Sequence, residues 1–278
     1  MKFTTYLLLF LSFTLFACSP NSPKKEVKES ASEIKNTKPN FINKAHEMVY
    51  ESVQKTNSLN MFDQKKDVTY TYSYVTGDGL ADIATEKYIF EGELSYGKYK
   101  KHKRTLANLE GVLEQGYDGK NYWCKVDGKP VEDEKTLNAV SFNRPTNYYW
   151  FTMMPKLLDP GLTYEYIGEK EVNDMSYDVV KVGFKPKDDK PTDIYQVYIN
   201  KDTKLMDQWL FTVADFGMLE KPLLMKVQYE KVDDILIPTN RKYKLSTWEG
   251  EVTDEPWTTV RWTNVKFKNG FTAAEFSK

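Results

Sequence analysis

The sequence predicts a mainly β domain built around one long antiparallel sheet that curls. The segment VTYTYSYV, residues 68–75, alternates valine or tyrosine with threonine or serine, which is the pattern of a half-buried strand. About eleven strand-like runs follow one another, and turn signals such as Asp118-Gly119 and Asp127-Gly128 separate them. Because strands twist, a sheet of this many strands is expected to curl rather than lie flat.

The eleven predicted strands lie within a single domain, residues 41–278, because no internal repeat and no linker divides it. They are residues 68–75, 87–94, 111–117, 121–126, 162–169, 177–184, 194–200, 205–213, 223–230, 241–248 and 258–267.

An amphipathic helix is predicted before the first strand, over residues 41–58. Five apolar residues recur there at helical spacing, and Asn40 or Asn43 is available as a cap. The five are Ile42, Ala45, Met48, Val49 and Val53.

A second helix is predicted in the segment TNYYWFTMMPKLLDPG, residues 146–161. Asn143 would cap it, Pro145 suits its first turn, and Pro160-Gly161 would end it. Pro155 lies inside this segment and removes one helical hydrogen bond, so we expect a kink or a break one turn before it.

This second helix is apolar over most of its circumference. Its narrow polar stripe is formed by Thr152, Lys156 and Asp159. Opposite this stripe lie Trp150, Met154 and Leu157, and next to them lie Met153 and Leu158. We predict that these five side chains face or flank a ligand cavity. A helix of this kind must be enclosed on most sides, so we place it over or inside the curved sheet.

The chain begins with a predicted signal peptide, residues 1–17. A single lysine precedes the apolar stretch YLLLFLSFTLF, residues 6–16, which is shorter than the roughly 20 residues of a membrane-spanning helix. The stretch ends in LFACS, where Leu15 and Ala17 precede Cys18, and this resembles a lipobox. The resemblance implies cleavage before Cys18 and its lipidation, hence a membrane anchor. The alternative is an ordinary secreted protein with a chance cysteine at its cleavage site.

Lipidation of Cys18 has a direct test. Metabolic labelling with an alkynyl fatty acid is expected to mark the wild type and to lose the mark in Cys18→Ala, because the thiol is the acceptor of the lipid. Equal labelling of both proteins would contradict the assignment.

A flexible tether is predicted over residues 18–40. It is rich in Ser, Pro, Lys and Glu, and it has too few large apolar side chains to offset its ordering entropy. Ser19 follows the cysteine, and no acidic run comes after it. We therefore expect a protein of the outer membrane whose domain faces the periplasm.

Composition argues against several classes of function. Loss of residues 1–17 leaves a net charge of about −2, so no nucleic-acid partner is expected. Two histidines without nearby ligand spacing predict no metal site, and we find no nucleophile elbow, phosphate loop or dinucleotide fingerprint. The sequence thus predicts no enzyme and no cofactor. If Cys18 is lipidated, Cys124 has no disulfide partner and is expected to be a small buried hydrophobe.

Three longer segments carry a resemblance to a known family. They are YDGKNYWCKVDGK at 117–129, VYINKDTKLMDQWLF at 197–211 and VQYEKVDDILIPTNRKY at 227–243. They resemble the LolA/LolB-like superfamily of periplasmic lipoprotein carriers and related outer-membrane lipoproteins. The segment WFTMMPKLLDPG resembles an uncharacterised bacterial lipoprotein group within that superfamily.

The resemblance implies a curved antiparallel half-barrel of about eleven strands, with helices plugging its concave face around a hydrophobic cavity. In the carriers, such a cavity holds the acyl chains of a lipoprotein in transit. This chain departs from the carrier because it has a lipidation signal of its own, as the receptor does. It also lacks a segment that matches the receptor's hydrophobic insertion loop.

Two functions follow as hypotheses. The first is a non-catalytic, membrane-anchored lipoprotein that binds lipid or acyl chains in the half-barrel cavity, in envelope lipid or lipoprotein handling. The second is a structural or interaction module with a closed core that binds a protein or glycan at the cell envelope. In the second case Trp248, Trp257 and Trp262 could form an exposed binding face. Neither hypothesis identifies a protein partner.

Overall fold

The computed structural model describes residues 39–185 and 191–278, and the fold is that of the unit Asn40–Lys278. The predicted signal peptide, Cys18 and the tether up to residue 38 lie outside the described residues, so their roles stay predictions. Within the described part of the chain, no helix combines the length and the apolar character needed to cross a membrane.

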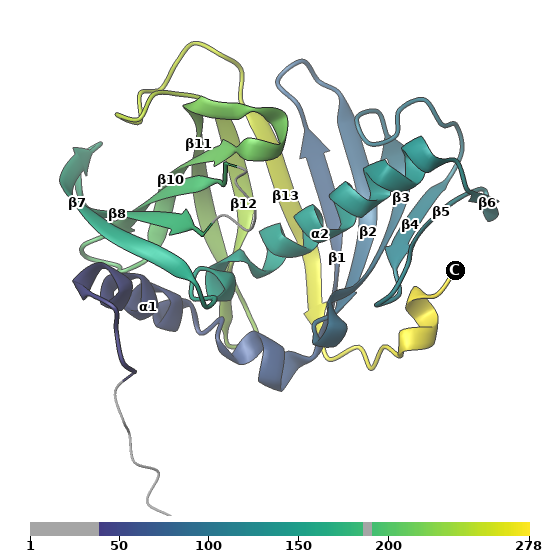
Figure 1. Ribbon diagram of the computed structural model, residues 1–278, viewed down its shortest axis with the longest axis horizontal. Helices are drawn as coiled ribbons and strands as arrows, with labels where there is room; N and C mark the ends of the chain where they lie inside the picture. The colour runs from purple at the N-terminus through teal and green to yellow at the C-terminus, as the bar shows by residue number, and fades with distance from the viewer. Residues whose placement is uncertain (1–38, 186–190) are drawn as a thin grey trace, which may run out of the picture. The chain divides into compact units, whose positions relative to one another are not determined.

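The described residues form one antiparallel sheet of thirteen strands, which confirms the predicted mainly β half-barrel. The strands lie in the order β6-β5-β4-β3-β2-β1-β13-β12-β11-β10-β9-β8-β7, so β6 and β7 are opposite edges and the sheet stays open. Figure 1 shows the sheet curving around the long helix α2. The strands are β1 Asp67–Val75, β2 Ala81–Ile89, β3 Leu94–His102, β4 Leu113–Tyr117, β5 Tyr122–Val126, β6 Lys129–Val131, β7 Leu162–Val172, β8 Met175–Phe184, β9 Ile194–Asn200, β10 Met206–Val213, β11 Met218–Val232, β12 Ile235–Leu245 and β13 Thr258–Phe267.

Two differences account for the strands beyond the expected eleven. The predicted strand 87–94 is wrong, because it spans the end of β2, the turn Glu91–Glu93 and the start of β3. Gly92 allows this reversal with a φ of 74°, a value that costs glycine little. The second difference is β6, which has only three residues and is too short to give a periodic signal.

The first helix is confirmed as α1, Lys44–Thr56. Its cap is Asn43, whose side-chain oxygen accepts a hydrogen bond from the backbone N–H of His46 at 2.9 Å. The remaining helical pieces are short turns: Met61–Lys65, Glu91–Glu93, Ala214–Phe216 and Ala273–Phe276.

The second helix is α2, Glu134–Lys156, so the expected start near Asn143 is wrong. Its cap is Asp133, whose Oδ1 accepts from the backbone N–H of Thr136 at 2.9 Å. Pro145 and Pro155 both lie inside the helix, which continues through them without a break. An internal proline costs about 3 kcal/mol, and the buried contacts of this helix offset that cost.

The order of the strands explains why α2 is so long. It follows β6 and precedes β7, the two edges of the sheet, whereas every other connection between strands joins neighbours. A helix of 23 residues is about 35 Å long, enough to cross the face of a curved sheet. The helix therefore lies across the concave face, as Figure 1 shows.

The core lies on both faces of the sheet. On the concave side, one apolar cluster joins α1 and the end of α2 to β7–β11, and another joins the earlier part of α2 to β1–β5, β12 and β13. A third, smaller cluster contains Tyr198, Leu210 and Leu224, whose side chains alternate with concave residues and therefore point to the convex face. Trp248 and Trp257 cover this third cluster.

Candidate functional site

The candidate site is a pocket of about 700 Å³ between α2 and the concave face of the sheet. Ligand pockets in proteins commonly have volumes of about 300–1,000 Å³. The lining comes mainly from α2, β1 and the strands β8–β13, with contributions from Arg104 and from the segments before β9 and after β10, and it is dominated by aromatic rings. These are Tyr70, Tyr72, Tyr74, Phe142, Tyr149, Trp150, Phe184, Tyr195, Phe211, Phe216, Tyr243 and Trp262.

Strand alternation and register build the sheet side of this pocket. Tyr70, Tyr72 and Tyr74 occupy every second position of β1, so their side chains share one face. The neighbouring β13 places Trp262 opposite Tyr72. From the sequence this alternation predicts only a half-buried strand. In the structure it lines one wall of the pocket with aromatic rings.

On the helix side, one edge-to-face and one tilted ring contact close the pocket. The ring of Trp150 lies 5.2 Å from that of Phe211 on β10, at an interplanar angle of 72°. Phe142 lies 5.2 Å from Phe216, which belongs to the turn after β10 and is 65% exposed. Such pairs stabilise by about 0.5–1.5 kcal/mol beyond the area that they bury. Phe216 thus stands at the rim, where a large exposed ring meets the helix.

Only one of the five predicted ligand residues contributes to the pocket lining. Trp150 does so, whereas Met153, Met154 and Leu157 are at most 3% exposed and pack in the cluster against β7–β11. Leu158 is partly buried against the same cluster. The predicted enclosure of this helix segment is confirmed, and the four residues hold its end against the sheet.

The three tryptophans proposed as an exposed face do not share one surface. Trp262 is 2% exposed and lies on the concave side, so its place in that face is wrong. Trp248 and Trp257 pack on the convex cluster. The reason is the position of Trp262 within β13, where alternation turns it toward α2.

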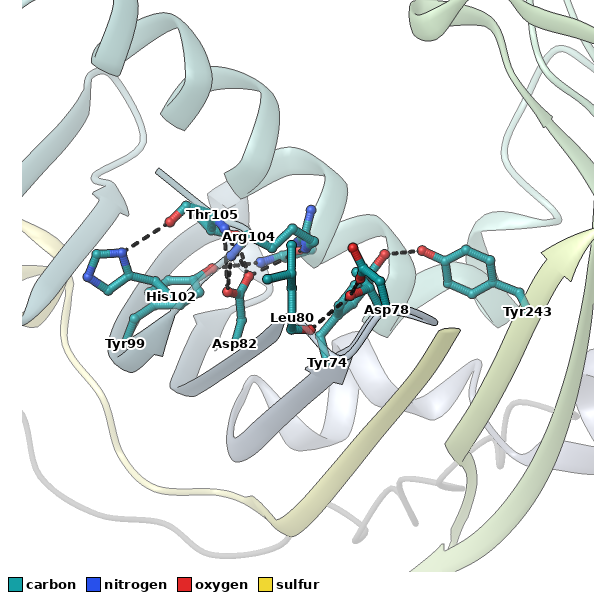
Figure 2. Close-up of polar contacts among 11 residues, drawn as sticks. Tyr74, Asp78, Leu80, Asp82, Tyr99, His102, Arg104, Thr105 and Tyr243 are labelled. Carbon is teal, nitrogen blue, oxygen red and sulfur yellow. Dashed lines mark hydrogen bonds and ion pairs between the residues drawn. The ribbon is translucent and has the colours of Figure 1, made fainter. Parts of the chain in front are cut away.

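A polar cluster, drawn in Figure 2, includes three residues of the pocket lining, Tyr74, Arg104 and Tyr243. The buried carboxylate of Asp82 accepts hydrogen bonds from the backbone N–H of Arg104 at 2.9 Å and from Thr105 Oγ1 at 2.7 Å. It also lies 3.4 Å from Arg104 Nε. The guanidinium of Arg104 is held 4.2 Å from the ring centre of Tyr74, whose hydroxyl contacts that of Tyr243. The charge of Arg104 is therefore paired with that of Asp82, and its guanidinium is held in place at the rim of the pocket.

A buried ion pair attaches α2 to the sheet. Arg144 Nη2 lies 2.6 Å from Glu86 Oε2 on β2, and both side chains are fully buried. Burial alone lowers the pKa of Arg144, but the adjacent Glu86 carboxylate outweighs it, so the pKa is raised. Tyr88 donates to Glu86 at 2.8 Å. Gly97 makes room, because a Cβ at that position would lie 2.4 Å from Arg144 Nη1.

A second buried arginine, Arg241 of β12, lies in the pocket lining and is 4% exposed. Its Nη2 donates to the backbone oxygen of Trp150 at 2.8 Å, and its Nε donates to that of Pro238 at 3.0 Å. The guanidinium carbon lies 4.1 Å from the ring centre of Trp262. Burial lowers the pKa of Arg241 to about 9, because no carboxylate in the described part of the chain offsets the lost hydration.

Several residues of the pocket lining were not predicted from the sequence: Arg104, Arg241 and the three tyrosines of β1. The tyrosines were recognised as strand residues, but the face that they line depends on the partner strands. The feature that marks Arg241 is its place on the concave face of β12, next to aromatic residues. That position becomes visible only when the register of β12 is known.

The described residues contain no group of three or more His, Cys, Asp or Glu side chains that could hold a metal ion. His102 is buried, and its two ring nitrogens lie 3.2 Å and 3.0 Å from the backbone oxygens of Thr105 and Gly111. His46 stacks on Tyr164 with ring centres 4.4 Å apart. Cys124 is buried as expected, and burial raises its pKa to about 11, which disfavours a reactive thiolate.

Comparison with known proteins finds similar chains among solved structures. No protein-family model matches the sequence. No curated protein matches it either. The chain is similar to a DUF1329 family protein from Desulfovibrio piger, with 14% identity and a TM-score of 0.47, over 82% of this chain and 97% of that one.

Two further similar structures have the same TM-score of 0.47. One is a LolA superfamily protein from Nitrosomonas europaea, with 8% identity over 83% of this chain and 97% of that one. The other is a putative outer membrane lipoprotein-sorting protein domain from Vibrio parahaemolyticus, with 9% identity over 82% and 97%.

Proposed function

We propose that this chain is a non-catalytic, membrane-anchored lipoprotein that binds an apolar ligand, lipid or acyl chains, in the pocket between α2 and the sheet. The observation that supports this most is the aromatic lining of a pocket of about 700 Å³. Aromatic and aliphatic walls with few polar groups suit acyl chains, because burial of each methylene contributes about 0.8 kcal/mol.

The proposal places the protein at the outer membrane, facing the periplasm, with lipidated Cys18 as its anchor. In this position the domain would take part in envelope lipid or lipoprotein handling. Of the predicted ligand residues, we propose that Trp150 contacts the ligand. Ligand contacts from Met153, Met154, Leu157 and Leu158 stay predictions. In the structure these four side chains pack against the sheet and support the end of α2.

Blocking the pocket tests the proposal. Thr146 lies on α2 in the pocket lining, so Thr146→Trp is expected to fill the space that an acyl chain needs. Native mass spectrometry of protein purified without detergent is expected to show an apolar ligand on the wild type. The affinity of Thr146→Trp for this ligand is expected to fall at least about tenfold, which corresponds to about 1.4 kcal/mol, and its occupancy should fall with it.

Asn138 provides a matched control, because it is exposed on the same helix and lies outside the pocket lining. Asn138→Trp is expected to keep the ligand at the wild-type level. A wild-type protein that carries no ligand and takes up none from added lipid would contradict the proposed function.

The second candidate, an interaction module with a closed core, has weaker support. The exposed binding face predicted for Trp248, Trp257 and Trp262 does not form, because Trp262 is buried. The exposed ring of Phe216 remains on the surface, but it belongs to the pocket rim. The pocket therefore favours a ligand-binding role over a closed core.

A further inference from the structure

Arg241 is a buried cation without a counter-charge. Among the described residues no carboxylate forms an ion pair with it, and its two hydrogen bonds go to neutral backbone oxygens. The groups that favour its charged form electrostatically are the hydroxyls of Tyr229, Tyr70 and Tyr72. Burial of an unpaired charge is costly, so such a group usually has a partner.

Arg144 of α2 and Arg104 of the pocket lining each have a carboxylate partner. Arg144 is as deeply buried, and it pairs with Glu86 at 2.6 Å. Arg104, on the rim, pairs with Asp82 at 3.4 Å. The fold therefore supplies a carboxylate to each of these arginines and leaves Arg241 without one.

The carboxylates in the pocket lining do not fill this role. Asp193 accepts from the backbone N–H of Ala214 at 2.7 Å and from Thr212 Oγ1 at 3.3 Å, at the far end of β9 and β10. Asp215 is exposed in the turn after β10. Neither carboxylate is within ion-pair distance of the Arg241 guanidinium.

Unused hydrogen-bond donors lie at the same place. Arg241 Nη1 and Trp262 Nε1 are both buried, and neither has an acceptor among the described residues. The Arg241 guanidinium lies over the Trp262 ring, 4.1 Å from its centre, and both residues line the pocket. Buried donors without acceptors are rare in native proteins, which suggests a polar ligand group here.

We propose that the pocket binds a long-chain carboxylate, whose anionic group supplies the counter-charge to Arg241 while its acyl chain lies along the aromatic wall. This inference rests on the proposed function and specifies the ligand class. The carboxylate is the anion that fits best, because it is small and planar and can pair with a guanidinium at short range. The aromatic rings of the lining accommodate the apolar remainder of the ligand.

The test compares an acid with its neutral analogue. The purified full chain is titrated with laurate and with 1-dodecanol, and binding is followed by tryptophan fluorescence, to which Trp150 and Trp262 contribute. Laurate is expected to bind the wild type at least about tenfold more tightly than dodecanol, which corresponds to about 1.4 kcal/mol. Arg241→Gln is expected to remove this preference, so that its affinities for laurate and dodecanol differ by less than about twofold.

Arg261 offers the matched control, because it is an exposed arginine on the adjacent β13 and bonds Asn240 at 2.7 Å, outside the pocket lining. Arg261→Gln is expected to keep the preference for laurate. Equal affinities of the wild type for the two ligands would overturn the carboxylate assignment and leave apolar binding in place. Binding of neither ligand would instead contradict the proposed function. The wild-type comparison decides even if Arg241→Gln does not fold.

Discussion

Replacement of Arg144 by methionine is expected to lower the free energy of unfolding by about 3–5 kcal/mol. The substitution leaves the carboxylate of Glu86 buried without its cation, and it removes the polar link between α2 and β2. The side chain also loses its contact with Ser95 Oγ, 3.3 Å from Nε. Urea unfolding of the full chain, followed by circular dichroism, measures the loss.

Two variants show whether the charge or the packing is responsible. Lys98→Met breaks a surface pair with Glu114, in which Lys98 is 50% exposed, and should cost at most about 1 kcal/mol. The double variant Glu86→Met with Arg144→Met removes both buried charges and should lose less stability than Arg144→Met alone. A single variant as stable as the wild type would show that the pair does not hold α2 on the sheet.

Replacement of Trp262 by alanine is expected to cost about 3–5 kcal/mol. Its ring lies 5.1 Å from that of Phe151 on α2 and 5.4 Å from that of Tyr70 on β1, so it packs between helix and sheet. Its removal leaves a cavity that rigid neighbouring rings cannot fill. The same unfolding measurement gives the loss.

Trp257 is the control for that prediction, because it is only half-buried on the convex side. Trp257→Ala is expected to cost clearly less than Trp262→Ala. The opposite order would place the dominant packing on the convex face and contradict the described core.

The class of the fold is visible in the sequence because strand periodicity is local. Alternation in residues 68–75 gives β1 almost to the residue, and Asn43 gives the start of α1. The reversal at Gly92 was missed because the flanking residues Phe90 and Leu94 continue an apolar alternation across it. The early start of α2 was missed because Asn143 and Pro145 form a cap and first-turn signal, whereas both residues lie inside the helix.

The site was predictable only in part, because a cavity depends on contacts between distant segments. Trp150 was identified from the helical wheel, and it does line the pocket. Met153, Met154 and Leu157 were equally apolar, but only the path of α2 across the sheet decides which apolar side chain meets a void. The proposed role of Arg241 depends on the absence of a nearby carboxylate among the described residues, which no local pattern records.

The most direct test of the central claim is the location of a bound acyl chain. A photoreactive fatty acid with a diazirine near the middle of its chain is added to the purified full chain, cross-linked, and the adducts are mapped by peptide mass spectrometry. A ligand in the pocket is expected to label the peptides that contain Trp150, Phe211 and Tyr243, and labelling should fall in Thr146→Trp. Adducts confined to the convex segment around Trp248 and Trp257, or labelling unchanged in Thr146→Trp, would contradict ligand binding between α2 and the sheet.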